Sequence, residues 1–525
     1  MIRDRRLYPL VLAIIFLHCG CAVGPDFTRP PVKVSQTWLD ASDERVKTEA
    51  AEYRNWWQSF NDPVLNGLID RAYRENLSLR IAGVRVLEAR AQLGIAVGGF
   101  YPQTQQAFGS LQYNRLSERS PLAVSNSNLS YWQSEIGLLA AWEIDFWGKF
   151  RRAIESADAS LLATVEDYDN TLVSLTADVA NFYILIRTGE KRLSIAHENV
   201  ETQKESLKIA ETRFKYGTVS QLDVEQAKTV LNNTLATIPV LETQLRQAKN
   251  ALSVLLGQPP SLLADELTAA SEIPVSPPQV VVVGIPADLL RRRPDIRSAE
   301  HRAAAQCAQI GVAKADLYPA FSLTGTFGFL SSDVGKFNLS DMFQWKSRTV
   351  QAGPSVQWNI LNYGRITNNV RVQDARFEQL LTTYQNAVLK AQQEVEDALV
   401  AFLRTQERAE FLAHSVTAAK RSLDLAVLQY REGTKDFTTV LIAEQALLNE
   451  QDNLASTLGS ISSNLVGVYR ALGGGWEIRE GRDFVSREVK EEMVKRTNWG
   501  KLLAPVSYNP PPTENPKSLI RFPDW

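Results

Sequence analysis

The stretch GPSVQWNILNYG, residues 353–364, alternates apolar and polar side chains almost without fault. A second stretch of this kind, LLAAWEIDFWG, occupies residues 138–148, and its Trp142 lies 216 positions before Trp358. Alternation with a period of two is typical of a β-strand that has one apolar face and one polar face. The sequence therefore predicts the same kind of strand twice. The apolar face of the two strands is expected to consist of Leu138, Trp142, Ile144, Val356, Trp358 and Ile360.

The repetition extends well beyond these strands. FYPQTQQAFGSLQ at 100–112 corresponds to LYPAFSLTGTFGF at 317–329, and RFKYGTVSQLDV at 213–224 corresponds to QYREGTKDFTTV at 429–440. All these pairs keep an offset of 216 or 217 residues, which indicates one duplicated architecture. The expected organisation is a signal peptide at 1–20, an N-terminal anchored segment at 21–62, a first repeat at 63–258, a Pro-rich linker at 259–285, a second repeat at 286–475 and a polar C-terminal tail at 476–525.

After Gly148 and Gly364 the hydrophobic period becomes seven, which is typical of a coiled-coil seam. Each helix is expected to run about 67 residues, until Gly217 or Gly433 ends it, and to measure about 100 Å at about 1.5 Å per residue. A rod of this length exceeds what a globular core needs. A shorter helix follows each rod, and Pro239 is expected to kink and interrupt the first of them. In the first repeat the seam comprises Val165, Leu172, Val179, Ile186, Leu193, Val200, Leu207 and Phe214.

The alternating strands have two interpretations. A half-buried strand of a soluble sandwich and a strand of a lipid-facing barrel wall share the same local pattern. Two-stranded hairpins are marginal by themselves, and an open sheet edge is not tolerated in lipid. If the strands span a membrane, several copies of the chain must therefore combine their four strands each. Two copies would give eight strands filled by side chains, whereas three would give twelve strands and a lumen.

The N-terminus reads as a targeting segment. The basic start MIRDRR precedes the apolar run LYPLVLAIIFL, which is too short to span a bilayer. Gly20 precedes Cys21, which suits cleavage in front of a cysteine that then receives lipid. Cys19 is the competing acceptor, but bulky His18 before it makes a poor cleavage position. An ordinary secretory leader that happens to contain cysteines is the other interpretation.

Composition excludes several classes of function. The chain of 525 residues is 44% apolar and 22% charged, unlike a disordered chain or a helical membrane bundle. Its net charge of −2 provides no basic surface, so we expect no nucleic-acid partner. No nucleophile motif, phosphate loop or metal-ligand spacing is present. We therefore expect no catalytic residues, no metal and no cofactor.

The motifs together resemble those of a known family. They are GCAVGPDFTRP, WWQSFNDPVLNGLI, WEIDFWGK, RFKYGTVSQLDV, LLRRRPDIRSAE, ADLYPAFSL and YRALGGGW, and they span residues 20–476 in order. The chain resembles the outer-membrane factors of Gram-negative bacteria, the TolC-like channels. It is most similar to their lipoprotein branch, the NodT-like proteins of resistance-nodulation-division (RND) efflux systems. The resemblance implies a mainly α protein with a membrane β-barrel part, in which a homotrimer builds a twelve-stranded barrel and a periplasmic α-barrel.

The resemblance also implies partners and a location. It places the protein in the outer membrane, in contact with outer-membrane lipid, lipid-anchored at Cys21 and extending into the periplasm. A periplasmic adaptor (membrane fusion) protein and an inner-membrane RND transporter would complete a tripartite pump that exports drugs and toxic compounds. The alternatives are a periplasmic coiled-coil lipoprotein scaffold without a pore, or an exit duct for type I protein secretion.

Two groups of site residues follow from the resemblance. Asp223 is expected to narrow the periplasmic mouth. Thr438 and Ile442 occupy places where an aliphatic residue and an acid are more usual, so the constriction from the second repeat is expected to be weaker or more apolar. The turns expected to dock the adaptor consist of Tyr216, Gly217, Thr218, Glu432, Gly433 and Thr434.

Overall fold

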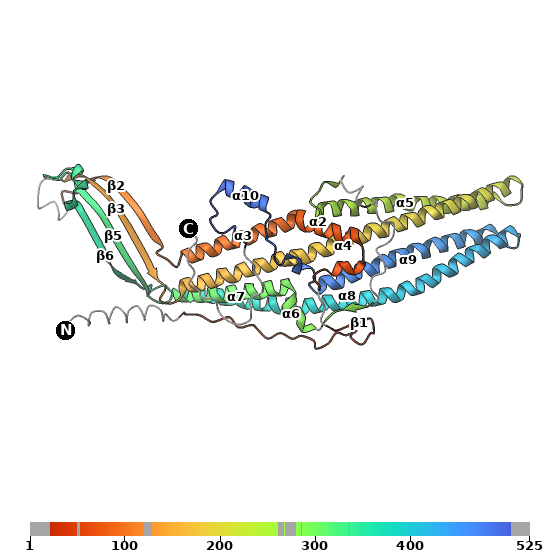
Figure 1. The fold of residues 1–525 in the computed structure, drawn as a ribbon, viewed down its shortest axis with the longest axis horizontal. Helices are drawn as coiled ribbons and strands as arrows, with labels where there is room; N and C mark the ends of the chain where they lie inside the picture. Colours follow the sequence, from red (N-terminus) through yellow and green to blue (C-terminus); the bar gives the residue numbers. More distant parts are fainter. Residues whose placement is uncertain are drawn as a thin grey trace.

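The computed structural model describes residues 22–49, 53–119, 129–260, 267, 280–284, 286–334 and 336–505. This part of the chain is elongated, with a four-stranded sheet at one end and long helical hairpins at the other (Figure 1). Shorter helices, the N-terminal segment and the C-terminal tail surround the middle. The molecule therefore has two chemically different ends joined by a helical body.

Two long helices of equal length form the body. Helix α4 spans Lys149–Lys215 and α8 spans Arg365–Arg431, and each has 67 residues, or about 100 Å. Each continues through a tight turn into a helix of 35 residues, α5 at Gln221–Leu255 and α9 at Phe437–Ala471. The predicted lengths and end points of the two rods are confirmed.

The seven-residue seam is buried where the helices overlap most. Leu172, Val179 and Ile186 have no exposed surface, because α4 packs there against α9 and the shorter helices. Towards the turn the seam opens, and Phe214 is 45% exposed. The shorter helices are α2 at Pro63–Glu75, α3 at Leu77–Gly98, α6 at Leu289–Arg292 and α7 at Pro294–Ala315.

The predicted interruption at Pro239 is wrong, because α5 continues through it from Gln221 to Leu255. Pro239 has no N–H, so the helix loses one backbone hydrogen bond. Because Pro239 lies on the exposed face of the helix, water can donate a hydrogen bond to the carbonyl group that is left without its backbone partner. The carbonyl oxygen of Pro239 accepts a hydrogen bond from Thr243 Oγ1 at 2.7 Å. One exposed bond is a small loss for a helix that packs along its whole length.

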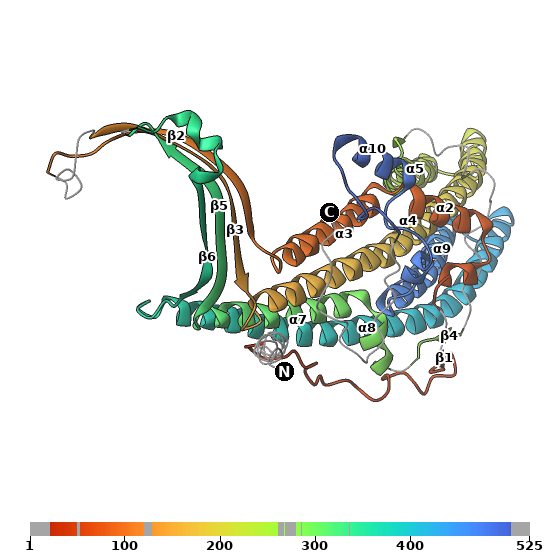
Figure 2. The ribbon, with the colours of Figure 1, turned by 60° about the vertical axis from the view of Figure 1, so that its left-hand side comes forward.

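All four strands of the sheet are antiparallel, in the order β2-β3-β5-β6. The first repeat supplies β2 at Thr104–Arg115 and β3 at Ser130–Ile144, and the second supplies β5 at Ala320–Ser332 and β6 at Arg348–Gln357. The pairing of β3 with β5 joins the two repeats, and β2 and β6 are the two edges. Figure 2 shows the strands curving away from the helices as one layer.

The strand prediction fails at one place. Trp358 and Ile360 follow the last residue of β6, Gln357, and are not part of the strand. The chain must turn there to enter α8, and Tyr363 and Gly364 take positive φ angles of 50° and 81° in that turn. The alternation of residue types therefore continues past the point where the backbone leaves the sheet.

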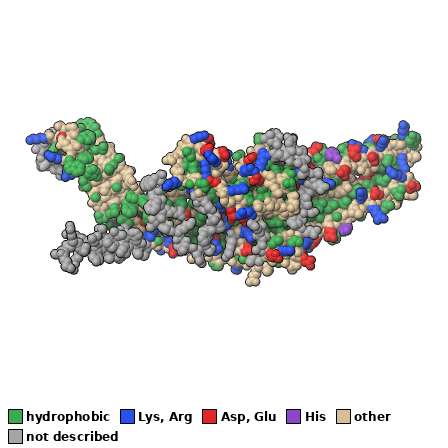
Figure 3. All heavy atoms as spheres, in the orientation of Figure 1, with side chains coloured by type: hydrophobic (Ala, Val, Ile, Leu, Met, Phe, Trp, Pro, Cys, Tyr) green, Lys and Arg blue, Asp and Glu red, His purple; other side chains and the backbone are tan. Residues whose placement is uncertain are grey.

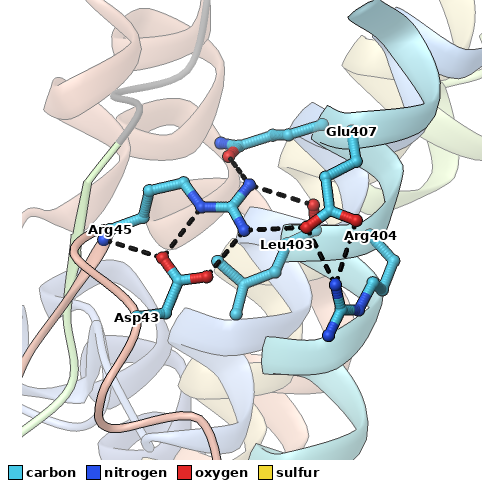
Figure 4. A network of polar contacts seen from close by, with 6 residues as sticks. Asp43, Arg45, Leu403, Arg404 and Glu407 are labelled. Carbon is cyan, nitrogen blue, oxygen red and sulfur yellow. Dashed lines mark hydrogen bonds and ion pairs between the residues drawn. The ribbon is translucent and has the colours of Figure 1, made fainter. Parts of the chain in front are cut away.

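The N-terminal segment crosses the outside of the helical body in an extended course (Figure 1). It ends in a two-residue strand, β1 at Val46–Lys47, which pairs in parallel with β4 at Val281–Val282. Beside β1, Arg45 donates hydrogen bonds to Asp43 Oδ1 at 2.9 Å and to the carbonyl oxygen of Leu403 at 3.2 Å, and it contacts Glu407 at 3.1 Å (Figure 4). Hydrogen bonds from Arg45 lower the pKa of Asp43 to about 2. These contacts tie the segment to α8.

The C-terminal tail folds back onto the body. A 3-10 helix, η7 at Trp476–Arg479, is followed by α10 at Arg487–Arg496. Arg479 forms a two-pronged ion pair with Asp169 of α4, with Nε–Oδ1 and Nη2–Oδ2 distances of 2.5 and 2.8 Å. The tail is thereby tied to α4, about one third of the way along the helix.

Candidate functional site

The turn between α4 and α5 has the geometry of a Schellman helix end. Gly217 has a φ of 70°, which favours glycine because it has no Cβ. Its N–H donates to the carbonyl oxygen of Phe214 at 2.9 Å, and the N–H of Thr218 donates to that of Arg213 at 3.0 Å. The hydroxyl of Thr218 donates to the same Arg213 oxygen at 3.0 Å. The turn is closed by its own backbone and by one threonine.

The turn between α8 and α9 repeats this geometry. Gly433 has a φ of 74° and donates to the carbonyl oxygen of Tyr430 at 3.1 Å. Thr434 donates to the carbonyl oxygen of Gln429 through its N–H and through its hydroxyl, both at 3.0 Å. The guanidinium of Arg213 lies 4.3 Å from the centre of the Tyr430 ring and donates to the Tyr430 carbonyl oxygen at 3.2 Å. Arg213 thus links the ends of the two hairpins, whose turns lie at the same end of the molecule in Figure 1.

The six residues predicted to dock an adaptor are all exposed at this end of the molecule. Tyr216 is 76% exposed. A Cβ atom built on Gly217 or Gly433 would meet no other atom within 4 Å. Larger side chains at these two positions would therefore project into open space, at the cost of backbone strain. We refer to the two turns, residues 216–218 and 432–434, as the rim.

The predicted constriction residues begin the two shorter helices. Asp223 accepts hydrogen bonds from Ser220 N at 2.9 Å and Ser220 Oγ at 3.0 Å, and so closes a capping box at the start of α5. Thr438 Oγ1 donates to Gln226 of α5 at 3.4 Å, which links the two hairpins again. Ile442 is 66% exposed. Asp223 therefore caps the start of α5, a structural role that the sequence analysis did not predict. Its role in narrowing the periplasmic mouth stays a prediction.

At the other end, the strand register sorts the side chains onto two faces. Residues directly opposite each other in antiparallel strands lie on the same face. Leu138 is opposite Phe327, and Phe327 is opposite Val350. One face therefore carries Leu138, Trp142, Ile144, Phe321, Leu323, Phe327, Val350 and Val356. The opposite face carries Gln106, Gln112, Gln133, Glu135, Glu143, Thr324, Thr326, Gln351, Ser355 and Gln357.

Two tryptophans mark the boundary between sheet and helices. Trp142 Nε1 donates to the carbonyl oxygen of Phe100 at 3.1 Å, and Trp358 Nε1 donates to that of Leu317, also at 3.1 Å. These are equivalent bonds in the two repeats. Tryptophan suits a membrane interface because its ring is apolar and its N–H is a donor. Trp358 thus occupies the same kind of place as Trp142, although it lies beyond the end of its strand.

The predicted lipid acceptor Cys21 lies outside the described residues. The next residue, Ala22, sits against the start of α4, where a Cβ on Gly148 would come within 2.7 Å of the Ala22 Cα. The N–H of Val23 donates to the carbonyl oxygen of Trp147 at 3.0 Å. The described chain therefore starts where the sheet meets the helices.

Sequence reasoning missed a buried ionic network in the helical body. Asp169 is fully buried, and besides Arg479 it has Arg297 of α7 at 3.7 Å. Arg297 also pairs with Glu166 at 2.5 Å, and its guanidinium lies 4.5 Å from the centre of the Trp476 ring. Burial raises the pKa of Glu166 to about 7. The sequence signal was Glu166 and Asp169, three residues apart on one side of α4 and flanked by the seam residues Val165 and Leu172.

A second buried acid lies near the rim. Glu444 of α9 is 2% exposed and accepts a hydrogen bond from the hydroxyl of Ser206 on α4. Its Oε2 atom has no hydrogen-bond partner among the described residues, and neither polar atom of buried Gln203 has one. Burial raises the pKa of Glu444 to about 7. No sequence pattern singled it out, because its partner is 238 residues away.

Within the described ranges, no group of three or more His, Cys, Asp or Glu side chains could hold a metal ion. None of the helices in the described ranges combines the length and the hydrophobicity that spanning a bilayer requires. The residues predicted as functional instead gather at the two ends of the molecule: an exposed rim of two turns, and a sheet with one apolar face. The predicted functional residues therefore form two separate surfaces at opposite ends of the molecule.

Comparisons with known proteins give consistent matches. The family model described as "Outer membrane efflux protein" matches residues 68–258 and 285–474. The solvent efflux pump outer membrane protein SrpC of Pseudomonas putida is 32% identical over 469 residues, which cover 88% of this chain and 97% of SrpC. Nodulation protein T of Rhizobium leguminosarum bv. trifolii is 29% identical over 465 residues, with coverages of 88% and 96%. The structure of the outer-membrane channel OprN matches with a TM-score of 0.81 and 33% identity, over 87% of this chain and 100% of the OprN chain.

Proposed function

Because the chain belongs to the outer membrane efflux protein family, we propose that it is the outer-membrane channel of a tripartite efflux pump. It is a passive homotrimeric duct that carries small molecules from the periplasm and the pump to the outside. The observation that carries this proposal is a sheet with one apolar face, joined end to end with helical hairpins of about 100 Å.

The sheet by itself is incomplete. Its edge strands β2 and β6 present unpaired backbone N–H and C=O groups. The hydrocarbon region of a bilayer offers these groups no hydrogen-bond partners, so open edges are unfavourable there. Three copies close the edges into a barrel of twelve strands, wide enough for a lumen. The apolar face then meets lipid, and the face with the glutamine and glutamate side chains lines the lumen. The helical hairpins of the three copies form the periplasmic tunnel below the barrel.

The lipid anchor fits this orientation. We propose that Cys21 carries the acyl chains, because Ala22 lies at the junction of the sheet and the helices, close to where the inner surface of the membrane must be. The anchored segment then runs down the outside of the helical body towards β1.

The rim is the surface furthest from the membrane, so it is the first surface available to proteins from the inner membrane. We assign the docking of a periplasmic adaptor, and through it of an inner-membrane RND transporter, to the rim residues. Asp223, Thr438 and Ile442 are assigned to the mouth just inside the rim. The exported compounds are small organic molecules by analogy with the relatives, one of which is named for solvent efflux. We assign the chain no enzymatic reaction.

Conductance separates this function from its main rival. Purified protein inserted into planar bilayers should give stable single-channel currents, whereas a periplasmic scaffold would give none. A deletion strain should become more sensitive to organic solvents and drugs. Unchanged sensitivity together with a defect in protein secretion would favour a type I exit duct instead.

Docking at the rim can be tested with a matched control. Gly217→Trp and Gly433→Trp should leave trimers and outer-membrane delivery intact but abolish efflux and cross-linking to the adaptor. Gly481 has a φ of 78° and an equally open Cβ position, but it lies in the C-terminal tail. Gly481→Trp imposes similar strain and should leave efflux unchanged. Normal efflux by both rim variants would exclude the rim as the docking surface.

A further inference from the structure

The connection between β5 and β6, at the end of the sheet furthest from the helices, folds over the apolar face. It contains two short 3-10 helices, η5 at Leu339–Phe343 and η6 at Trp345–Ser347. The ring of Trp345 lies 6.4 Å from that of Phe327 and 6.3 Å from that of Phe329, measured between centres. Ser331 Oγ donates to the carbonyl oxygen of Asn338 at 2.8 Å, which holds the connection against the strand.

Both acidic side chains of this connection accept hydrogen bonds from other groups of the protein. Asp333 Oδ1 accepts the backbone N–H of Trp132 in β3 at 2.7 Å. The carboxylate of Asp341 accepts the N–H of Asn338 at 2.9 Å and the side-chain amide of Gln344 at 2.7 Å. Their negative charge is therefore directed at backbone and amide donors of the protein.

The basic side chains, in contrast, are directed outward. Lys336, Lys346 and Arg348 are exposed, and none forms an ion pair with a residue in the described ranges. The guanidinium of Arg348 lies 5.0 Å from the centre of the Trp345 ring, and Nη1 donates to the Trp345 carbonyl oxygen at 2.8 Å. Three large aromatic side chains among them are also exposed: Phe337 at 66%, Phe343 at 81% and Trp345 at 65%.

We name these six residues, Lys336, Phe337, Phe343, Trp345, Lys346 and Arg348, the loop patch. Basic and hydrophobic side chains gather at this end of the molecule (Figure 3). The register places the patch directly above the apolar face, because Arg348 is opposite Phe329 and the next row inward pairs Val350 with Phe327. The patch thus stands where an apolar surface changes into a charged one.

We propose that the loop patch binds a phosphorylated, acylated lipid of the outer leaflet. The cationic side chains contact its phosphate groups, the exposed rings lie at the level of the headgroup, and the acyl chains cover the row of Leu138, Phe327 and Val350 below. Arg348 suits phosphate because its planar guanidinium donates several hydrogen bonds at once. The proposal rests on the proposed function for its orientation, which places this end of the sheet at the outer surface.

The test uses purified full-length trimers and native mass spectrometry. The probes are bisphosphorylated lipid A and the same lipid after removal of its phosphates, each titrated with and without inorganic phosphate in excess. Wild type should bind the phosphorylated lipid preferentially. In Lys346→Gln/Arg348→Gln this binding should weaken by on the order of 30-fold, as expected for two charges near a lipid phosphate surface. Lys420→Gln/Arg421→Gln, an exposed basic pair on α8, makes the same charge change and should have no effect.

Three results would overturn the proposal: equal binding of both lipids by the wild type, unchanged binding in the patch variant, or full competition by inorganic phosphate, which would indicate a free-phosphate site. A patch variant that still forms trimers and conducts in planar bilayers shows that any loss of lipid binding is not a failure to fold. Conductance of the wild type in the same preparation tests the proposed function separately.

Discussion

Replacing Glu444 with glutamine should make the packing of α4 against α9 near the rim independent of pH. In the wild type, burial raises the pKa of Glu444 from 4.5 to about 7, and the hydrogen bond from Ser206 only partly opposes this effect. The residues one turn away on α9, Val440, Leu441 and Leu447, are buried and apolar. Tyr430 belongs to the hydrophobic cluster that these residues form, and its hydroxyl is buried with no hydrogen-bond partner among the described residues. The guanidinium of Arg213 lies over the Tyr430 ring, so Tyr430 and Arg213 are the titratable and charged groups next to this cluster.

The direction of the pH effect on stability depends on whether the folded or the unfolded state binds the proton of Glu444 more tightly. The folded state keeps the proton up to about pH 7, whereas the unfolded chain releases it near 4.5. Below 4.5 both states are protonated, and the carboxyl group costs no stability. Between pH 4.5 and pH 7 the buried carboxylate lowers the free energy of unfolding by a growing amount, and above pH 7 this loss is constant at about 3 kcal/mol. The figure follows from about 1.4 kcal/mol for each tenfold difference in proton affinity between the folded and unfolded states. Stability of this contact is therefore lost as the pH rises through that window.

Hydrogen exchange of purified trimers measures this locally. After correction for intrinsic exchange, protection of peptides from 200–212 and 440–450 should fall by up to about 100-fold between about pH 5 and pH 8 in the wild type. Glu444→Gln should keep high protection throughout. Glu205→Gln, which changes an exposed carboxylate on the same stretch of α4, should follow the wild type. A wild type without pH dependence, or a Glu444→Gln variant that retains it, would refute the reasoning.

Three further predictions concern the anchor, the sheet and the core. Labelled palmitate should be incorporated by the wild type and lost in Cys21→Ser, and label that persists would contradict the assignment. Leu138→Arg should impair membrane insertion, with a cost of about 2–4 kcal/mol, whereas Leu139→Arg on the opposite face should insert normally; equal behaviour of these neighbours would exclude a barrel wall. Arg479→Met leaves Asp169 buried without its main partner and should destabilise the helical body by about 3 kcal/mol in thermal unfolding, and adding Asp169→Asn should restore part of the loss.

The features read correctly from the sequence are those with local causes. The period of seven predicted two rods of 67 residues, because a seam must return to the same side of a helix. The ends at Gly217 and Gly433 were predictable, because a Schellman turn needs a residue that tolerates positive φ. The faces of Leu138, Trp142, Ile144 and Val356 were predictable from alternation alone, because neighbouring residues of a strand point to opposite sides.

Other features were decided only when distant segments met. Where β6 ends depends on the turn into α8, so Trp358 and Ile360 kept the alternation of a strand without being in one. Pro239 did not break α5, because packing along a whole helix outweighs one exposed hydrogen bond.

Asp169 and Arg479 are 310 residues apart, and Glu444 and Ser206 are 238 apart. A pattern in a short stretch of sequence cannot show that Asp169 will form an ion pair with an arginine, or that Glu444 will be buried with only the hydroxyl of Ser206 as its hydrogen-bond partner. Periodicity in the sequence determines which side of an element is apolar, whereas the charge and hydrogen bonding of a buried group depend on neighbours that only the folded chain brings together.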